Sequence, residues 1–204
     1  MTKEITLHKI ESAEHFSDKL PLHAIDTINW QEFPYAPCVS FRIAYTPNEI
    51  CIKFYVEEQH VKGSFLLDNE TVCQDSCVEC FVMPEGSEQY YNFEFNCLGT
   101  LLAAKRITRP DSTRLTPDEL KRITRVSSIG RERIDTTHNA PHWDLFVTIP
   151  FDLIGCEEPP RMMRANLYKC GDKTIEPHFL SWSPIDTPTP NFHSPSTFGL
   201  LRLG

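Results

Sequence analysis

Planar polar side chains that alternate with apolar residues are the feature of this sequence best suited to ligand chemistry. Arg42, Glu79, Asn92 and Asn96 each occupy the polar phase of such an alternating segment. Guanidinium, carboxylate and carboxamide groups make paired hydrogen bonds, which suit the hydroxyl groups of a sugar. An antiparallel sheet with one face in solvent shows the same alternation without any ligand. The pattern alone therefore leaves a sugar-binding face and a solvated face both open.

An aromatic ring is the second component of a sugar site, because the apolar face of a pyranose stacks on a planar ring. Trp143 alternates in phase with Leu145 and Val147, which indicates a core position. Trp182 lies in the loop-like segment 179–184, where a large ring has fewer structural reasons to be buried. We therefore expect Trp182 to be the stacking platform, with a packing role as the alternative.

Two other kinds of chemistry stay open. Glu79 and Glu94 could form the carboxylate pair of a glycoside hydrolase, but carboxylates on a sheet face are more often solvated or ion-paired. The sequence also has no GxSxG nucleophile motif. His178, His193 and the cysteines keep a metal- or haem-binding domain possible. We expect a binding protein more than an enzyme.

The eight cysteines are predicted to be free thiols that are mostly buried, because most lie in apolar or strand-like stretches. Cys73, Cys77 and Cys80 form the densest group. A structural zinc site usually needs a second short Cys or His pair, which is missing near this group. On a strand, Cys77 and Cys80 would also face opposite sides. The spacing therefore argues against zinc bound by these three residues.

The surrounding chain must supply the strands that position these groups. Period-two alternation and turn residues predict an all-β, antiparallel β-sandwich. One short helix is predicted near residue 117, with Thr116 as N-cap, Pro117 at the first helical position and Glu119 closing a capping box. The predicted strands are 38–45, 50–57, 76–83, 90–98, 100–105, 142–149, 164–170 and 198–203.

Composition limits the partners and the location. The formal net charge of -8 argues against nucleic acid as a partner. No apolar run approaches the roughly 20 residues that span a bilayer, so we expect no membrane insertion. The first residues lack an apolar signal core, which predicts a cytoplasmic protein, or a secreted or periplasmic one if a leader precedes this sequence. Residues 1–204 are expected to form a single domain.

Several segments in the same order resemble the family 9 carbohydrate-binding modules of the kind attached to xylanases. The segments are QDSCVECF (74–81), YYNFEFNCLGT (90–100), WDLFVTIPF (143–151), ANLYKCGD (165–172), FLSWSP (179–184) and PNFH (190–193). The resemblance spans nearly the whole chain. It implies a DOMON-like, immunoglobulin-like β-sandwich that binds a mono- or oligosaccharide without catalysis, in a carbohydrate-catabolism context.

The resemblance also implies roles for particular residues. Better-known members grip the sugar between two tryptophans, and Trp182 matches one of these rings. Glu79, Asn96 and Asn166 match polar positions on the strands. The second ring is left open among Trp30, Tyr55, Tyr91 and Phe192. Structural calcium is common in the family, and its oxygen ligands here would come from Asp68, Asn69, Glu70 or Asp75, although their spacing matches no defined calcium loop.

Overall fold

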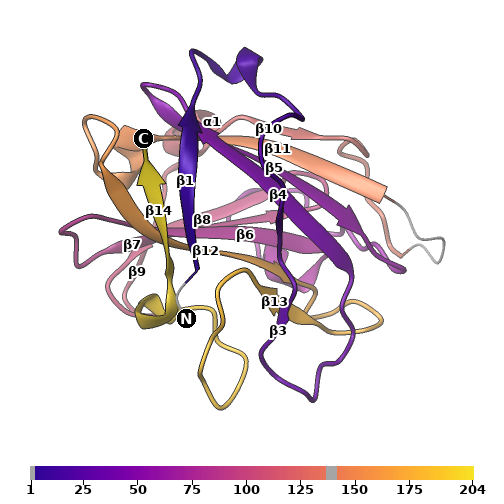
Figure 1. Cartoon of the computed structure of the whole chain (residues 1–204). Helices are drawn as coiled ribbons and strands as arrows, with labels where there is room; N and C mark the ends of the chain where they lie inside the picture. The colour runs from indigo at the N-terminus through magenta and orange to yellow at the C-terminus, as the bar shows by residue number, and fades with distance from the viewer. Residues whose placement is uncertain (1–2, 137–141) are drawn as a thin grey trace.

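The computed structural model describes residues 3–136 and 142–204, which form two facing β-sheets (Figure 1). The strands are β1 (Glu4–Lys9), β2 (His23–Ala24), β3 (Thr27–Ile28), β4 (Cys38–Tyr45), β5 (Glu49–Glu57), β6 (Cys77–Pro84), β7 (Tyr90–Asn96), β8 (Leu101–Arg106), β9 (Ser112–Arg114), β10 (Arg125–Ser127), β11 (His142–Pro150), β12 (Met162–Cys170), β13 (Phe179–Ser181) and β14 (Gly199–Leu203). The helix is α1 (Pro117–Lys121), and short 3₁₀ turns lie at Ala13–His15, Val72–Gln74, Phe151–Ile154 and Pro195–Thr197. No helix in the described ranges is long and apolar enough to cross a bilayer.

The two sheets are named here after their central strands. The β5 sheet has the order β10-β11-β5-β4, and the β6 sheet has the order β14-β12-β6-β7-β8-β9. Strand β1 joins them, because its first part pairs with β14 and its last residues pair with β4. Both of these pairings are parallel, whereas the other strand pairs are antiparallel. The predicted all-β sandwich is confirmed, and the parallel strand β1 adds a feature that alternation did not indicate.

Local sequence signals placed eight of the fourteen strands in the described ranges and the helix α1, but did not indicate β1, β2, β3, β9, β10 or β13. Strand β4 has the predicted bounds, β5 and β11 differ from prediction by one residue at one end, and β6 and β8 differ by one residue at each end. In α1, the Thr116 hydroxyl accepts from the Glu119 backbone N–H and the Glu119 carboxylate accepts from the Thr116 N–H. The predicted capping box is therefore confirmed.

The main core lies between the sheets. Residues such as Phe41 and Ile52 from the β5 sheet are buried with Val78 and Phe93 from the β6 sheet in one apolar cluster. Burying such side chains contributes roughly 1.5–3 kcal/mol each, so alternation on both sheets directs the chain toward this sandwich. Cys80 also joins this core, while Cys77 faces the other side of β6, as predicted.

The opposite face of the β6 sheet is buried as well, which the alternation did not predict. A second apolar cluster on this face combines Phe81 and Tyr168 of the sheet with Trp30, Phe192 and Phe198 of the connecting segments. Every residue of β7 is consequently buried. This face is therefore a covered surface with polar groups enclosed in it, and not the solvent-facing one that an open antiparallel sheet would have.

Candidate functional site

A small pocket remains where the connecting segments do not fully cover the β6 sheet. Its volume is about 90 Å³, enough for several water molecules and so for one end of a ligand. Strands β6, β7 and β12 form its floor, and the segment 190–193 forms one wall. The pocket is lined by Cys73, Glu79, Glu94, Arg109, Cys170, Asp172, Phe179, Pro190, Asn191, Phe192 and His193.

Two glutamates lie side by side on the pocket floor. Glu79 and Glu94 are direct cross-strand partners on β6 and β7. The Cys170 thiol donates to Glu79 Oε1 at 3.1 Å, and Asn92 Nδ2 donates to Glu94 Oε1 at 2.9 Å. Arg106 Nε in turn donates to Asn92 Oδ1 at 2.7 Å, which fixes the amide orientation. The floor is thus a pre-positioned set of hydrogen-bonding groups.

Burial changes the ionisation of these carboxyl groups. It raises the pKa of Glu94 to about 7, against the attraction of Arg114 and Arg106. Burial, followed by repulsion from Glu94, raises the pKa of Glu79 well above its ordinary value. Burial also raises the pKa of Asp172 at the pocket. Protonated carboxyl groups can donate as well as accept, so the floor can match both sides of a hydroxyl group.

The walls add aromatic rings. Phe192 stacks on Tyr168 with ring centroids 4.1 Å apart and lines the pocket with its remaining surface. Phe179 stands edge-on to Phe192. His193 Nδ1 is 2.9 Å from the Tyr90 hydroxyl, and burial lowers the pKa of His193 to about 3, helped by Arg106 and Arg109. His193 is therefore a neutral ring at physiological pH.

Glu79 and Phe192 are the predicted site residues that the structure places in this pocket, and Asn92 lies beside it through its hydrogen bond to Glu94. Arg42 lies elsewhere, on the outer face of the β5 sheet. Its guanidinium contacts the Leu20 carbonyl oxygen and stands 5.7 Å from the ring centre of Tyr55. The expectation that Arg42 joins Glu79 on one face is wrong, because β4 and β6 belong to different sheets.

Asn96 and Asn166 hold the chain rather than face the pocket. The Asn96 side chain donates to Phe65 O and Asp75 Oδ2 and accepts from the backbone N–H groups of Leu98 and Thr100. The Asn166 side chain likewise bonds the backbone of Ser183 and Leu167. Both amides have their hydrogen bonds within the protein, so neither is placed to bind a ligand directly.

The prediction that Trp182 is the ring on which a sugar stacks is wrong. Trp182 is only 3% exposed and lies in the main core, edge-on to the ring of Phe41 and against Gly199. Trp182 directly follows β13, and its backbone N–H donates to Leu167 O of β12 at 2.8 Å, which holds this loop-like segment against the sheet. Tyr91 also belongs to the main core, on the side of β7 away from the pocket. Trp30 is buried too, and its indole N–H donates to Thr187 O at 2.8 Å.

Other pocket residues were not identified as site residues from sequence. Arg109, Asp172 and Asn191 lie on connecting segments, and Cys170 ends β12. Asp172 and Asn191 fall inside the family-like segments 165–172 and 190–193, which was the one available signal. Arg109 had none, because nothing local indicates which loop folds over the sheet.

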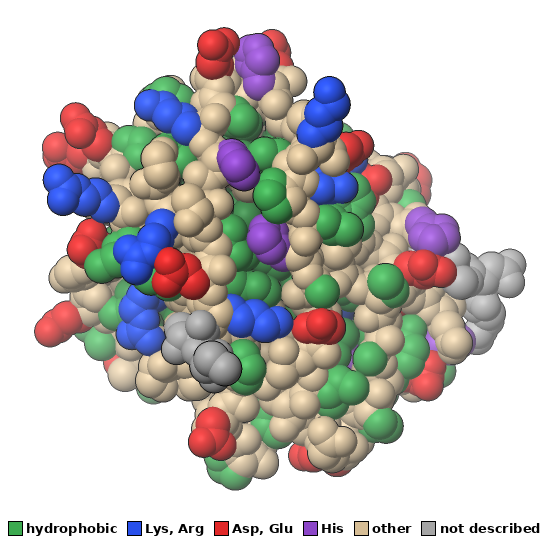
Figure 2. All heavy atoms as spheres, in the orientation of Figure 1, with side chains coloured by type: hydrophobic (Ala, Val, Ile, Leu, Met, Phe, Trp, Pro, Cys, Tyr) green, Lys and Arg blue, Asp and Glu red, His purple; other side chains and the backbone are tan. Residues whose placement is uncertain are grey.

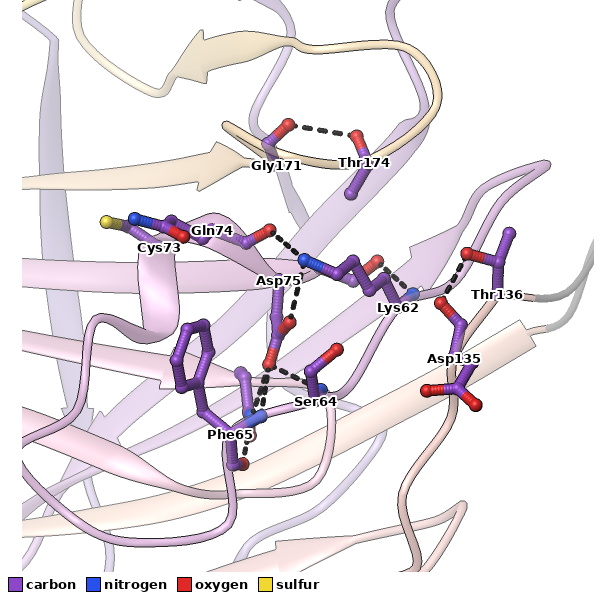
Figure 3. Close-up of polar contacts among 12 residues, drawn as sticks. Lys62, Ser64, Phe65, Cys73, Gln74, Asp75, Asp135, Thr136, Gly171 and Thr174 are labelled. Atoms are coloured by element: carbon purple, nitrogen blue, oxygen red, sulfur yellow. Dashed lines mark hydrogen bonds and ion pairs between the residues drawn. The ribbon is translucent and has the colours of Figure 1, made fainter.

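The loop before β6 does not fit a calcium ion. Its acidic groups already have partners within the protein: Asp75 Oδ2 accepts from the N–H groups of Ser64 and Phe65, and Oδ1, which accepts no hydrogen bond from the described residues, is ion-paired with Lys62 Nζ at 3.6 Å (Figure 3). Asp68 binds Arg125 at 2.6 Å, and Glu70 Oε2 accepts from the N–H groups at 66 and 67. Among the described residues these carboxylates do not converge on a common point, so we derive no role for calcium there.

His178 is not available as a metal or haem ligand either. Its Nε2 is 2.8 Å from Lys169 Nζ and its Nδ1 is 2.7 Å from Glu176 O. Lys169 forms a fully buried ion pair with Glu58 at 2.9 Å.

The visible face in Figure 2 has acidic and basic side chains intermixed, with no extended basic patch for nucleic acid.

Comparison with models of protein families shows which family the chain belongs to. The family model of carbohydrate-binding family 9 matches residues 12–203. The chain belongs to carbohydrate-binding family 9. No curated protein matches the sequence. This family 9 chain has the fold of a candidate carbohydrate-binding protein from Bacteroides uniformis ATCC 8492, with 34% identity, a TM-score of 0.95 and full coverage of both chains.

More distant structures share the fold. Two structures of a family 9 module from Caldicellulosiruptor kristjanssonii, one in complex with glucose and one with cellotriose, are 14% and 13% identical to this family 9 chain. Their TM-scores are 0.58 and 0.62, with 99% and 98% of this chain and 96% and 93% of theirs covered. At this identity the likeness extends to the fold alone.

Proposed function

We propose that this family 9 protein binds a mono- or oligosaccharide without catalysis, in the pocket on the covered face of the β6 sheet. One observation carries the proposal: the rings of Phe179 and Phe192 stand beside the carboxyl groups of Glu79 and Glu94 and the guanidinium of Arg109 in a single pocket. A sugar offers both an apolar ring face and hydroxyl groups, and this mixture matches both. The whole chain is proposed to act as one binding unit.

The chemistry of the floor supports a neutral ligand with hydroxyl groups. A buried carboxyl with a raised pKa gains little from a negatively charged guest and can exchange hydrogen bonds with a neutral one. The related Caldicellulosiruptor module was solved with glucose and cellotriose, so we propose glucose and short glucans as the first sugars to test.

Isothermal titration calorimetry and thermal shift against a glycan panel test the proposal, in buffer containing EDTA. A binding sugar should raise Tm in proportion to its affinity. Phe192→Ala and Glu79→Gln should each weaken binding about tenfold or more, which corresponds to about 1.4 kcal/mol. Leu22→Ala and Glu85→Gln are matched controls, because both residues are exposed away from the pocket, and they should bind as the wild type does.

Absence of any response across the panel would reject the proposal, as would equal affinity in pocket and control variants. Chromatography of the same oligosaccharides after long incubation separates binding from hydrolysis by the Glu79–Glu94 pair. We expect the oligosaccharides to be recovered intact. Release of shorter sugars, lost in Glu79→Gln, would instead establish the glycosidase alternative.

A calcium requirement at the loop before β6 is not part of this proposal. The oxygens of Asp68, Glu70 and Asp75 are engaged by Arg125, backbone N–H groups and Lys62. We therefore expect the same Tm in calcium and in EDTA. A rise in Tm with calcium that Asp68→Asn abolishes would contradict this assignment.

A further inference from the structure

Thiol groups converge on the pocket floor in a way that sugar binding does not use. Cys77 and Cys170 are direct cross-strand partners on β6 and β12, and both face Glu79. The donor atoms of Cys77, Glu79 and Cys170 all lie within 4.8 Å of one another. Sequence spacing did not reveal this group of three residues. The group joins Cys77 to Cys170, more than ninety positions away, and leaves out Cys80, whose side chain enters the main core.

The separations suit a tetrahedral metal ion. Zn–S bonds of about 2.3 Å and Zn–O bonds of about 2.1 Å place sulfur and oxygen ligands about 3.6 Å apart. Glu79 Oε1 is 3.1 Å from Cys170 Sγ and 4.0 Å from Cys77 Sγ. Shifts of roughly half an ångström would bring Glu79 to this distance from both sulfur atoms, and the two sulfur atoms already lie within 4.8 Å of each other.

The charge of the neighbouring side chains and the access from solvent also favour a bound cation. Glu79 stands directly opposite Glu94, and like charges in such a pair repel. Lys169 is adjacent to Cys170 in sequence, but its ammonium forms its ion pair with Glu58, at 2.9 Å, and not with Glu79. When both glutamates are ionised, a cation bound to Glu79 would offset this repulsion. Cys170 and Glu79 both line the pocket, which provides an entry path from solvent.

We propose that Cys77, Glu79 and Cys170 form a zinc site at the floor of the pocket, with the fourth coordination position open to a water or hydroxyl group. Sulfur donors select zinc over calcium or magnesium, which prefer oxygen ligands. Three protein ligands and an open position distinguish such a site from a closed structural one. Cys73 and Asp172 also line the pocket. The site does not depend on sugar binding.

Cobalt titration of the reduced, EDTA-treated and desalted full chain tests the assignment directly. We expect saturation at one Co²⁺ per chain, with sulfur-to-cobalt charge-transfer absorption and tetrahedral d–d bands, and displacement of both by Zn²⁺. Cys170→Ser should lose most of the charge-transfer absorption. Cys38→Ser is the matched control, because Cys38 is exposed on β4, and it should retain the full spectrum.

Circular dichroism of the metal-free protein shows whether Cys170→Ser still folds. If it does not, Glu79→Gln tests the same site, because this variant keeps both thiols. It should retain charge-transfer absorption but bind Zn²⁺ about tenfold or more weakly in competition with a chromophoric chelator. The inference is overturned if the wild type shows no saturable band, if Cys170→Ser keeps it or Cys38→Ser loses it, or if Glu79→Gln binds with unchanged affinity. Sugar titration in EDTA reports on the proposed function separately.

Discussion

Replacing Glu94 with Gln should stabilise the protein at alkaline pH and leave it nearly unchanged at acidic pH. Glu94 is buried on the pocket floor, where its carboxyl oxygen accepts from Asn92. Gln has the shape of a protonated Glu and keeps an oxygen acceptor for Asn92. It therefore removes the cost of ionising a buried group while preserving its packing.

The magnitude follows from the pKa of Glu94, which burial raises from 4.5 to about 7 in the folded protein. At about 1.4 kcal/mol per pH unit, ionising Glu94 costs the folded state about 3 kcal/mol. Between these two pKa values the folded state binds more protons than the unfolded state. The stability contributed by this group is therefore complete below pH 4.5 and is lost as pH rises through about 7.

Urea unfolding at a series of pH values measures the effect. The free energy of unfolding of Glu94→Gln should exceed that of the wild type by about 3 kcal/mol at about pH 8 and by close to zero at about pH 4. Glu85→Gln, which changes an exposed carboxylate in the β6–β7 turn, should show no such divergence. Parallel stability curves for wild type and Glu94→Gln would refute the reasoning, because Glu94 would then ionise as it does in the unfolded chain.

Further substitutions separate core and scaffold residues from the pocket. Trp182→Ala should lower the free energy of unfolding by about 3–5 kcal/mol in urea titrations, because it leaves a cavity in the main core; a near-neutral change would show that the indole is not packed there. Asn96→Ala should cost about 2–4 kcal/mol by the same measurement, since buried N–H and C=O partners lose their hydrogen bonds. Thr116→Ala should cost about 1 kcal/mol and lower Tm, through loss of the N-cap; an unchanged Tm would contradict the capping role.

Strands β4 to β8, β11, β12 and β14 were predictable because their signal is local. Side chains on a strand alternate with period two, so residues such as Val39 and Phe41 indicate their own face without reference to the rest of the chain. The helix was predictable for the same reason, since the Thr116–Glu119 capping box is complete within a single turn. Local patterns do not reveal what covers a sheet. The polar phase of β7 looked solvent-facing, yet Trp30 and Phe192 come from distant segments to bury it.

The site was only partly predictable for a related reason. Glu79 lines the pocket, and its strand and phase could both be inferred from the sequence, whereas its role in binding stays a prediction. Arg42 has the same phase on its own strand, but alternation does not say which of the two sheets a strand joins. Arg109 comes from a loop, and its position depends on how the β8–β9 connection folds over the sheet. Residue type and spacing identified the chemistry, whereas the tertiary packing decided which groups meet.

Asparagines illustrate how one residue type serves two purposes on the same face. Asn92 orients a carboxyl group of the pocket floor, while Asn96, four residues along β7, binds four backbone and side-chain groups that hold the turn 97–100 and the segment around Phe65. Sequence alternation makes the two residues equivalent. The difference arises because Asn96 ends its strand, where neighbouring backbone groups lack sheet partners and need a side chain to satisfy them. A buried polar residue at a strand end is therefore better interpreted as scaffold, and one within the strand beside a pocket as a candidate for ligand binding.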